Sequence, residues 1–414
     1  MKRIIFSEIE GRSAGFRGLA VTLGVFFLAG LAAVVYVEHA GHYVTGGSNQ
    51  VVWGIPDVFA MFLIVAASGV LNVAIISSVF RKTLYRPLER LSCLLALAML
   101  LGGLMILVLD LGRPDRVIVA MLNRNFTSIF AWNFYLYTGF IAIVVVYLWL
   151  QMERRMNRFV PAAGMVALLW RLALTTGSGS IYGVLVAREA YGSAIMAPLF
   201  IAMSFSFGLA VYNLVLLAAC KGSGRDIGDV LLRRLGRLLG IFVAVVLYFT
   251  AVQHLTNLYA AEHSGVERFI LRDGGIYTLL FWGGQVMVGG LLPLVLVFVS
   301  SRRGLRPGGR TVALASVLVI TGAFCQLYVL IIGGQAYPLT LFPGMEVSSS
   351  FYDGVVASYT PSLPEIGLGL GGVALAGLVV LFGIKLLRFL PTTLENAAID
   401  PHYLGVRRAP GNSE

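Results

Sequence analysis

The chain has 414 residues, of which 58% are hydrophobic and 12% are charged, and its mean hydropathy is +0.85. Soluble domains are about 25% charged, so this composition excludes an ordinary soluble protein and predicts a polytopic membrane protein. The formal net charge is +11 at pH 7.

Ten apolar runs are long enough to cross about 30 Å of hydrocarbon, which takes about 20 residues each. They lie at roughly 16–37, 55–80, 91–110, 128–150, 159–177, 194–219, 239–260, 276–299, 311–333 and 364–388. The sequence therefore predicts an all-α fold of about ten transmembrane helices. Residues 1–414 form a single integral membrane domain, because little chain remains for anything else.

The basic residues follow the membrane topology. Twenty-four of the 31 lysines and arginines lie in the segments on the side of the two termini, and six lie on the opposite side. Cytoplasmic loops carry an excess of Lys and Arg, so both termini are predicted to be cytoplasmic. The charge therefore reflects topology, and we expect no nucleic-acid partner.

Polar residues gather near the outer ends of the first two runs. Glu38 and His39 follow the first run. His39 and His42 are three residues apart and could both ligate a metal ion, but no further set of metal ligands accompanies them, so we expect no metal site. Asp57 follows Ile55 and Pro56 at the start of the second run. Its carboxylate could cap the helix or handle a proton.

The third run ends in the most distinctive stretch of the chain, Leu109 to Arg116. Asp110 closes the run, and a turn carrying Arg113, Asp115 and Arg116 follows at once. A carboxylate at a membrane edge has its pKa raised by desolvation and lowered by a nearby arginine, which suits proton transfer near neutral pH. The alternative is a salt bridge from Asp110 to Arg113 that shapes the helix end.

The fourth run opens with Trp132, Asn133 and Tyr135, which we expect at the level of Asp110. An interfacial aromatic belt also explains the Trp and Tyr.

In the fifth run, Arg171 lies about 18 Å in from Phe159, somewhat past mid-membrane. Thr175 and Ser178 belong to a predicted polar break after it, which suggests a proton pathway. Alternatively, backbone carbonyls at a broken helix end satisfy Arg171.

His254 is a histidine near the interior of the seventh run, and no second axial histidine accompanies it, so we expect no haem. Cys93, Cys220 and Cys325 form no CxxC pattern, which argues against an iron–sulfur cluster. The outward loop 334–363 is a candidate docking surface, because loops of that length usually have a function.

A weak internal repeat suggests two similar four-helix bundles. Arg90 precedes Asp110 by the same spacing as Arg237 precedes Asn257. We therefore expect a first bundle at 55–190 and a second at 194–333, with 16–37 and 364–388 as flanking spans.

Segments 54–80, 109–116 and 128–140 resemble the NrfD family, the quinone-interacting membrane subunits named with the polysulfide reductase membrane subunit. Asp110-Leu111-Gly112-Arg113-Pro114 is the most specific signature, and the ten-span length resembles the DsrP/HmcC-like subgroup of the DsrMKJOP and Hmc redox complexes. The resemblance implies two four-helix bundles, a quinone (menaquinone or ubiquinone) bound toward the outer face, and no haem or iron–sulfur cluster in this chain. It also implies a bacterial or archaeal cytoplasmic membrane, a periplasmic cubane iron–sulfur ferredoxin-like partner, other membrane and cytochrome subunits, and a connection to sulfur metabolism.

On this interpretation the chain exchanges electrons between quinone and the iron–sulfur partner and has no catalysis of its own outside the complex. Quinol oxidation releases two protons, which calls for a proton acceptor and for partners to both oxygens. The candidates are Asp110, Arg113 and Asp57 as catalytic residues, Asn133, Tyr135, Trp132, His254 and His39 around the quinone, and Arg171, Thr175, Ser178 and Glu38 as a proton pathway. The alternatives are a secondary transporter of a small solute, suggested by parallel repeats and a broken span, and a passive membrane anchor.

Overall fold

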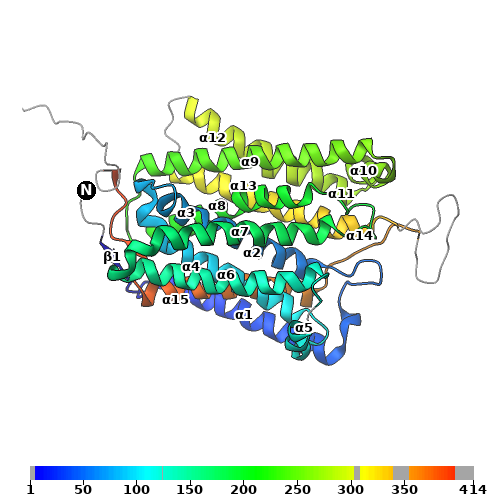
Figure 1. The fold of residues 1–414 in the computed structure, drawn as a ribbon, viewed down its shortest axis with the longest axis horizontal. Helices are drawn as coiled ribbons and strands as arrows, with labels where there is room; N and C mark the ends of the chain where they lie inside the picture. The colour runs from blue at the N-terminus through cyan, green and yellow to red at the C-terminus, as the bar shows by residue number, and fades with distance from the viewer. Residues whose placement is uncertain (1–4, 124, 303–307, 339–353, 397–414) are drawn as a thin grey trace, which may run out of the picture.

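The computed structural model describes residues 5–123, 125–302, 308–338 and 354–396. Long helices lie side by side across the molecule (Figure 1). In these described ranges, ten helical stretches are long and apolar enough to cross a membrane. The predicted all-α polytopic fold is confirmed.

The elements follow in chain order. The α-helices are α1 (Ala14–Ala40), α2 (Ile55–Val70), α3 (Asn72–Ser78), α4 (Glu89–Leu109), α5 (Val117–Leu122), α6 (Ile129–Met152), α7 (Val160–Gly183), α8 (Met196–Gly222), α9 (Asp229–Tyr259), α10 (Ser264–Arg268), α11 (Ile276–Leu279), α12 (Leu292–Arg302), α13 (Gly309–Tyr328), α14 (Gly334–Ala336) and α15 (Leu363–Leu386). Short 3₁₀ turns are η1 (His42–Val44), η2 (Thr83–Leu88), η3 (Pro114–Arg116), η4 (Arg154–Phe159) and η5 (Ala261–His263), and π-helical segments are η6 (Phe269–Asp273), η7 (Leu280–Leu291) and η8 (Val329–Gly333). The strands are β1 (Phe6–Ser7) and β2 (Leu390–Pro391).

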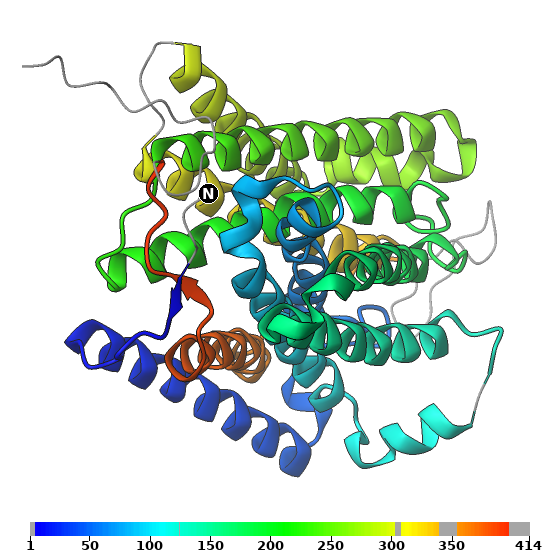
Figure 2. The ribbon, with the colours of Figure 1, turned by 60° about the vertical axis from the view of Figure 1, so that its left-hand side comes forward.

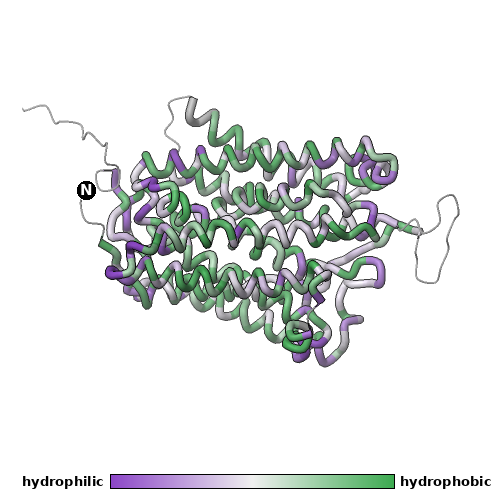
Figure 3. Tube along the Cα trace, in the orientation of Figure 1, coloured by the Kyte–Doolittle hydropathy of each residue, from purple (hydrophilic) through white to green (hydrophobic). Residues whose placement is uncertain are grey.

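Hydropathy divides the molecule into a hydrophobic middle and two polar ends (Figure 3). The strands β1 and β2 pair antiparallel, with Phe6 opposite Pro391. Residues near both ends of the sequence therefore lie at the same polar end, as an even number of spans requires. Figure 2 shows α15 running beside α1 on the flank of the molecule.

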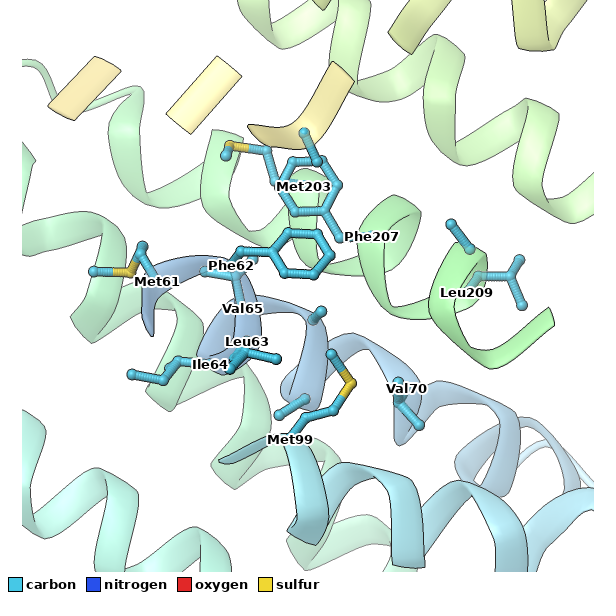
Figure 4. Close-up of a cluster of buried hydrophobic side chains, with 14 of the residues drawn as sticks. Met61, Phe62, Leu63, Ile64, Val65, Val70, Met99, Met203, Phe207 and Leu209 are labelled. Atoms are coloured by element: carbon cyan, nitrogen blue, oxygen red, sulfur yellow. The ribbon is translucent and has the colours of Figure 1, made fainter. Parts of the chain in front are cut away.

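The second span is the centre of the core. The most apolar window of the α2–α3 stretch is 89% buried, as expected of a helix that is hydrophobic on all sides. Phe62 of α2 meets Phe207 of α8 with ring centroids 5.9 Å apart (Figure 4). Nearby, a Cβ at Gly69 would lie 1.6 Å from the carbonyl oxygen of Ser204. Backbone thus meets backbone where α2 crosses α8, which only a glycine at position 69 permits.

The helices pack in two groups and one pair. The first group is α2, α4, α6 and α7; the second is α8, α9, α12 with η7, and α13; α1 packs on α15, which in turn packs on α4. The two groups meet where α2 and α7 both contact α8. We propose that they are the two bundles, 55–190 and 194–333, that the repeat suggested.

The predicted polar break after Arg171 is wrong, because α7 runs from Val160 to Gly183 without interruption. The hydroxyls of Thr175 and Ser178 donate to the carbonyl oxygens of Arg171 and Leu174, at 2.9 and 3.0 Å. A hydroxyl that bonds back to the preceding turn is satisfied inside a helix, so these residues do not end it.

The interruption lies instead in the second span, at Leu71 between α2 and α3. The Ser92 hydroxyl of α4 inserts there: it donates to the Val70 carbonyl at 2.8 Å and accepts from the Ala74 amide at 3.2 Å. It thereby replaces the i to i+4 bond that a continuous helix would make between those two residues.

Candidate functional site

Asp110 lies where α4 ends, at the polar end opposite β1 and β2. It is the C-cap residue, and its amide donates to Ile106 at 2.9 Å. Its side chain lines a cavity of about 270 Å³. The residues around this cavity, called the outer cavity below, are His42, Thr45, Gly47, Val52, Gly54, Pro56, Asp110, Gly112 and Glu365.

Two carboxylates, Asp110 and Glu365, line this cavity, and a third, Asp57, lies close to both. Asp110 comes from the end of α4, Asp57 from the first turn of α2 and Glu365 from the first turn of α15; each of the other two acts electrostatically on Asp57. Burial raises the pKa of Asp110 to about 6, the nearby His42 opposes the rise, and the charge of Glu365 adds to it. Asp110 is therefore able to change protonation state close to neutral pH.

Asp57 caps its own helix. The Gly54 amide donates to its Oδ2 atom at 3.1 Å, and Pro56 occupies the first turn, where no hydrogen bond is lost. The capping interpretation of Asp57 is therefore confirmed. The same side chain lies close enough to Asp110 for the two carboxyl groups to interact electrostatically.

Glu365 is a buried site residue that sequence reasoning missed, with 5% of its surface exposed. Its Oε2 atom accepts from the amides of Gly46 and Ser362 at 2.9 and 2.7 Å, and its Oε1 atom accepts from the Tyr359 hydroxyl at 2.9 Å. Ser362 and Glu365 form a capping box, a pattern visible in the sequence that indicates only a helix start. Nothing in the sequence indicates that Glu365 lies beside Gly46.

Tyr359 and Gly54 hold this carboxylate in place. The Tyr359 hydroxyl accepts from the Ile55 amide at 2.8 Å, and burial raises the pKa of Tyr359, so the hydroxyl stays protonated and donates to Glu365. A Cβ at Gly54 would lie 2.7 Å from both Glu365 Oε1 and the Tyr359 hydroxyl. Glycine at position 54 therefore makes room for the pair.

The neighbours expected for Asp110 differ from those found. Arg113 is exposed, and within the described residues no ion pair joins it to Asp110. The helix-end salt bridge was therefore wrong; Asp110 faces the cavity while Arg113 lies in the solvent-exposed turn before η3. His42, in η1, lines the outer cavity, whereas Glu38 and His39 are exposed in the last turns of α1 and do not line it.

A family model described as "Polysulphide reductase, NrfD" matches residues 43–338. The chain belongs to the NrfD family. A relative in Archaeoglobus fulgidus, named "Hdr-like menaquinol oxidoreductase integral membrane subunit", is 30% identical over 402 residues, covering 95% of this chain and 99% of that protein. The C subunit of a polysulfide reductase from Wolinella succinogenes is 24% identical, and the match spans 70% of this chain and 96% of that protein. "Menaquinone reductase, integral membrane subunit" of Nitratidesulfovibrio vulgaris is 24% identical, and the corresponding shares are 90% and 91%.

The NrfD match omits two residues of the outer cavity. It begins at residue 43 and ends at residue 338, so His42 and the whole of α15 with Glu365 lie outside it. The turn η1 after α1 and the start of α15 therefore bring side chains to a site whose centre, Asp110, lies within the family region. Together, the match and the ten apolar helices establish a multi-pass membrane protein.

The residues that open the fourth span do not line the outer cavity. Trp132 and Tyr135 donate to the carbonyls of Phe126 and Met121, at 2.9 and 3.0 Å, and so tie α6 to the segment before it. Asn133 is buried; its Nδ2 donates to the carbonyl oxygens of Ile129 and Gly177 at 2.9 and 3.3 Å, while its Oδ1 has no partner among the described residues.

His254 lies in a different cavity, within the second helix group. Its Nδ1 atom is 2.6 Å from Oε2 of Glu267, which is 1% exposed and also accepts from Asn257 at 2.8 Å. Thr250, Gln253, Gln285 and Gln326 line the same space. The sequence offered no partner for His254; the structure supplies Glu267 from α10. Among the described residues, no group of three or more His, Cys, Asp or Glu side chains is arranged to hold a metal.

Arg171 is fully buried and joins α7 to the interruption in the second span. One of its terminal nitrogens, Nη1, donates to the Ser68 carbonyl at 3.2 Å and to the side chain of Asn72. Its guanidinium carbon lies 4.5 Å from the ring centroid of Phe205. The positive charge thus meets a helix C-terminus, where carbonyl oxygens carry partial negative charge.

Proposed function

We propose that this NrfD-family chain is the quinone-reactive integral membrane subunit of a multi-subunit respiratory redox complex. It exchanges electrons between the membrane quinone pool and an iron–sulfur protein docked at the outer face, in a complex that acts in sulfur metabolism. The names of two relatives contain menaquinol or menaquinone and that of another contains polysulfide, so menaquinone is the quinone we propose.

The outer cavity supports this proposal by its position and size. Its volume of about 270 Å³ is close to the lower end of ligand pockets, roughly 300–1,000 Å³. That space suits a quinone headgroup, with the tail outside among lipids. Val52 and Pro56 offer apolar contacts to the ring, while His42, Thr45 and Asp110 offer polar ones to its oxygens.

The main support for the proposal is the raised pKa of Asp110. A quinol must lose two protons with its two electrons, and a good acceptor has a pKa near the working pH. Burial raises the pKa of Asp110 to about 6, whereas Asp57 and Glu365 already accept hydrogen bonds from backbone amides. We therefore assign the proton-accepting role to Asp110, with His42 as a partner for a quinone oxygen.

The remaining candidates take other roles in this proposal. Trp132, Asn133 and Tyr135 stabilise the outer end of α6, and Arg171 stabilises the interrupted second span. A broken fifth span was one of the features that suggested a secondary transporter, but α7 is continuous. We propose cytoplasmic termini and an outer cavity on the far side, from the excess of basic residues at the terminal end. Half of the predicted docking loop, 334–363, lies outside the described residues, namely 339–353.

The substitution Asp110→Asn tests the assignment in the assembled complex. We expect quinol-linked electron transfer to fall about a hundredfold or more, the usual contribution of a positioned proton acceptor, while the subunits still copurify. The control is Asp115→Asn, which removes a carboxylate from the adjacent exposed turn. Loss of assembly with unchanged activity per complex would mean that Asp110 is structural.

A further inference from the structure

A second cavity of about 270 Å³ lies at the terminal end of the molecule, far from the outer cavity. It sits where the start of α9 meets the end of α12 and the start of α13, helices that run together along one edge of the molecule (Figure 1). Its lining comprises Val230, Arg233, Arg234, Gly236, Arg237, Val297, Phe298, Thr311 and Val312. The Gly228 amide just before α9 donates to the carbonyl oxygen of Leu394 at 2.9 Å, so the start of α9 lies beside the segment that follows β2.

The polar part of the lining is a cluster of three arginines. Arg233, Arg234 and Arg237 are exposed, and none forms an ion pair with another described residue. Asp229, one turn earlier, also interacts with another group. The three guanidinium groups that line the cavity are all positively charged, so we expect its ligand to be an anion.

The other part of the lining is apolar. Val297 and Val312 are buried, and Phe298, 37% exposed, stands at the edge. A Cβ at Gly236 would lie 3.3 Å from Val312 Cγ2, so the glycine keeps the floor of the cavity open. A free inorganic anion would gain nothing from these side chains. A ligand that joins an anionic head to a hydrocarbon tail would use both parts.

We propose that this cavity binds the headgroup of an anionic phospholipid. The phosphodiester accepts hydrogen bonds from the guanidinium groups of Arg233, Arg234 and Arg237, since arginine matches phosphate geometry with paired N–H donors. The first part of an acyl chain lies along Phe298 and Val312. Basic pockets between transmembrane helices at the cytoplasmic interface are suited to such lipids. The site is independent of the outer cavity and of the proposed redox function.

The protein offers a matched control. Arg154, Arg155 and Arg158 in η4 repeat the spacing of Arg233, Arg234 and Arg237 on the same basic side, but they do not line this cavity. Replacing either trio by glutamine removes the same charge from the same side of the membrane. Any difference between the two variants therefore reports the cavity and not the surface potential.

The experiment measures lipid binding to the purified, delipidated protein by native mass spectrometry, with phosphatidylglycerol, cardiolipin and phosphatidylcholine as probes. We expect the anionic lipids to bind the wild type and the R154Q/R155Q/R158Q control alike. The R233Q/R234Q/R237Q variant should bind them on the order of a hundredfold more weakly, because each arginine near the surface contributes about a factor of five to ten. Phosphatidylcholine should bind none of the proteins tightly.

Further arms separate the alternatives. The R233K/R234K/R237K variant should keep intermediate binding, which also shows that substitution in this cluster leaves the fold intact. Equal weakening in the two glutamine variants, or none in R233Q/R234Q/R237Q, would overturn the proposal. So would competition by millimolar inorganic phosphate as effective as that by phosphatidylglycerol, since the site would then hold a free anion.

Discussion

Asp110→Asn should stabilise the protein at neutral pH while it removes activity. The ordinary pKa of this carboxyl is 3.8, and burial raises it to about 6 in the folded protein. One pKa unit corresponds to about 1.4 kcal/mol, so an ionised Asp110 costs the native state up to about 3 kcal/mol. Asparagine has a similar shape and no charge, so it avoids that cost.

The sign of the pH dependence follows from proton binding. Between about pH 4 and pH 6 the native state holds a proton on Asp110 that the unfolded state has lost, so the free energy of unfolding falls as pH rises. Above about pH 6 both states are ionised and the full cost remains. The gain from Asp110→Asn should therefore be largest above pH 6 and vanish below about pH 4.

Denaturant titration of the purified protein in detergent, at about pH 4 and pH 7.5, measures this gain. The Asp115→Asn control should leave the free energy of unfolding unchanged at both pH values, because Asp115 is exposed. A higher stability in Asp110→Asn at pH 7.5 that disappears at pH 4 is the expected result. Equal or lower stability at pH 7.5 would refute the reasoning, since it would mean that the ionised carboxylate is favourably paired in the native state.

Three further predictions concern the surroundings of Asp110 and the packing of the second span. Glu365→Gln removes one negative charge that acts on Asp110, so the midpoint of the pH profile of quinol-linked electron transfer should move to lower pH; an unmoved midpoint would contradict the proposed coupling. Arg171→Leu leaves a carbonyl and an amide side chain unpaired in the second span, and the free energy of unfolding should fall by about 1–3 kcal/mol or more. Gly69→Ala places a Cβ against backbone and should abolish accumulation of folded protein in membranes, whereas Gly24→Ala, which meets nothing within 4 Å, should accumulate normally.

The errors at Arg171 and Asp110 have a common physical origin. The hydropathy of 159–177 and the polar residues after it are equally compatible with a helix end and with a helix whose hydroxyls bond to their own backbone. The difference depends on whether neighbouring helices enclose the segment. Likewise, a charge pair such as Asp110 and Arg113 is close in sequence, but a turn directs the two side chains to different surroundings.

The sequence by itself determined the number of spans, the shared side of the two termini and the family, and it singled out Asp110 as a candidate. These depend on local quantities, namely apolar length, charge between spans and a short contiguous motif. Only the tertiary structure decided which groups share the outer cavity. His42, Asp110 and Glu365 meet there across more than 300 residues of sequence, with Asp57 close by, because α15 packs against α4 and α2. Such contacts follow from helix packing in three dimensions, which leaves no periodic trace in the sequence.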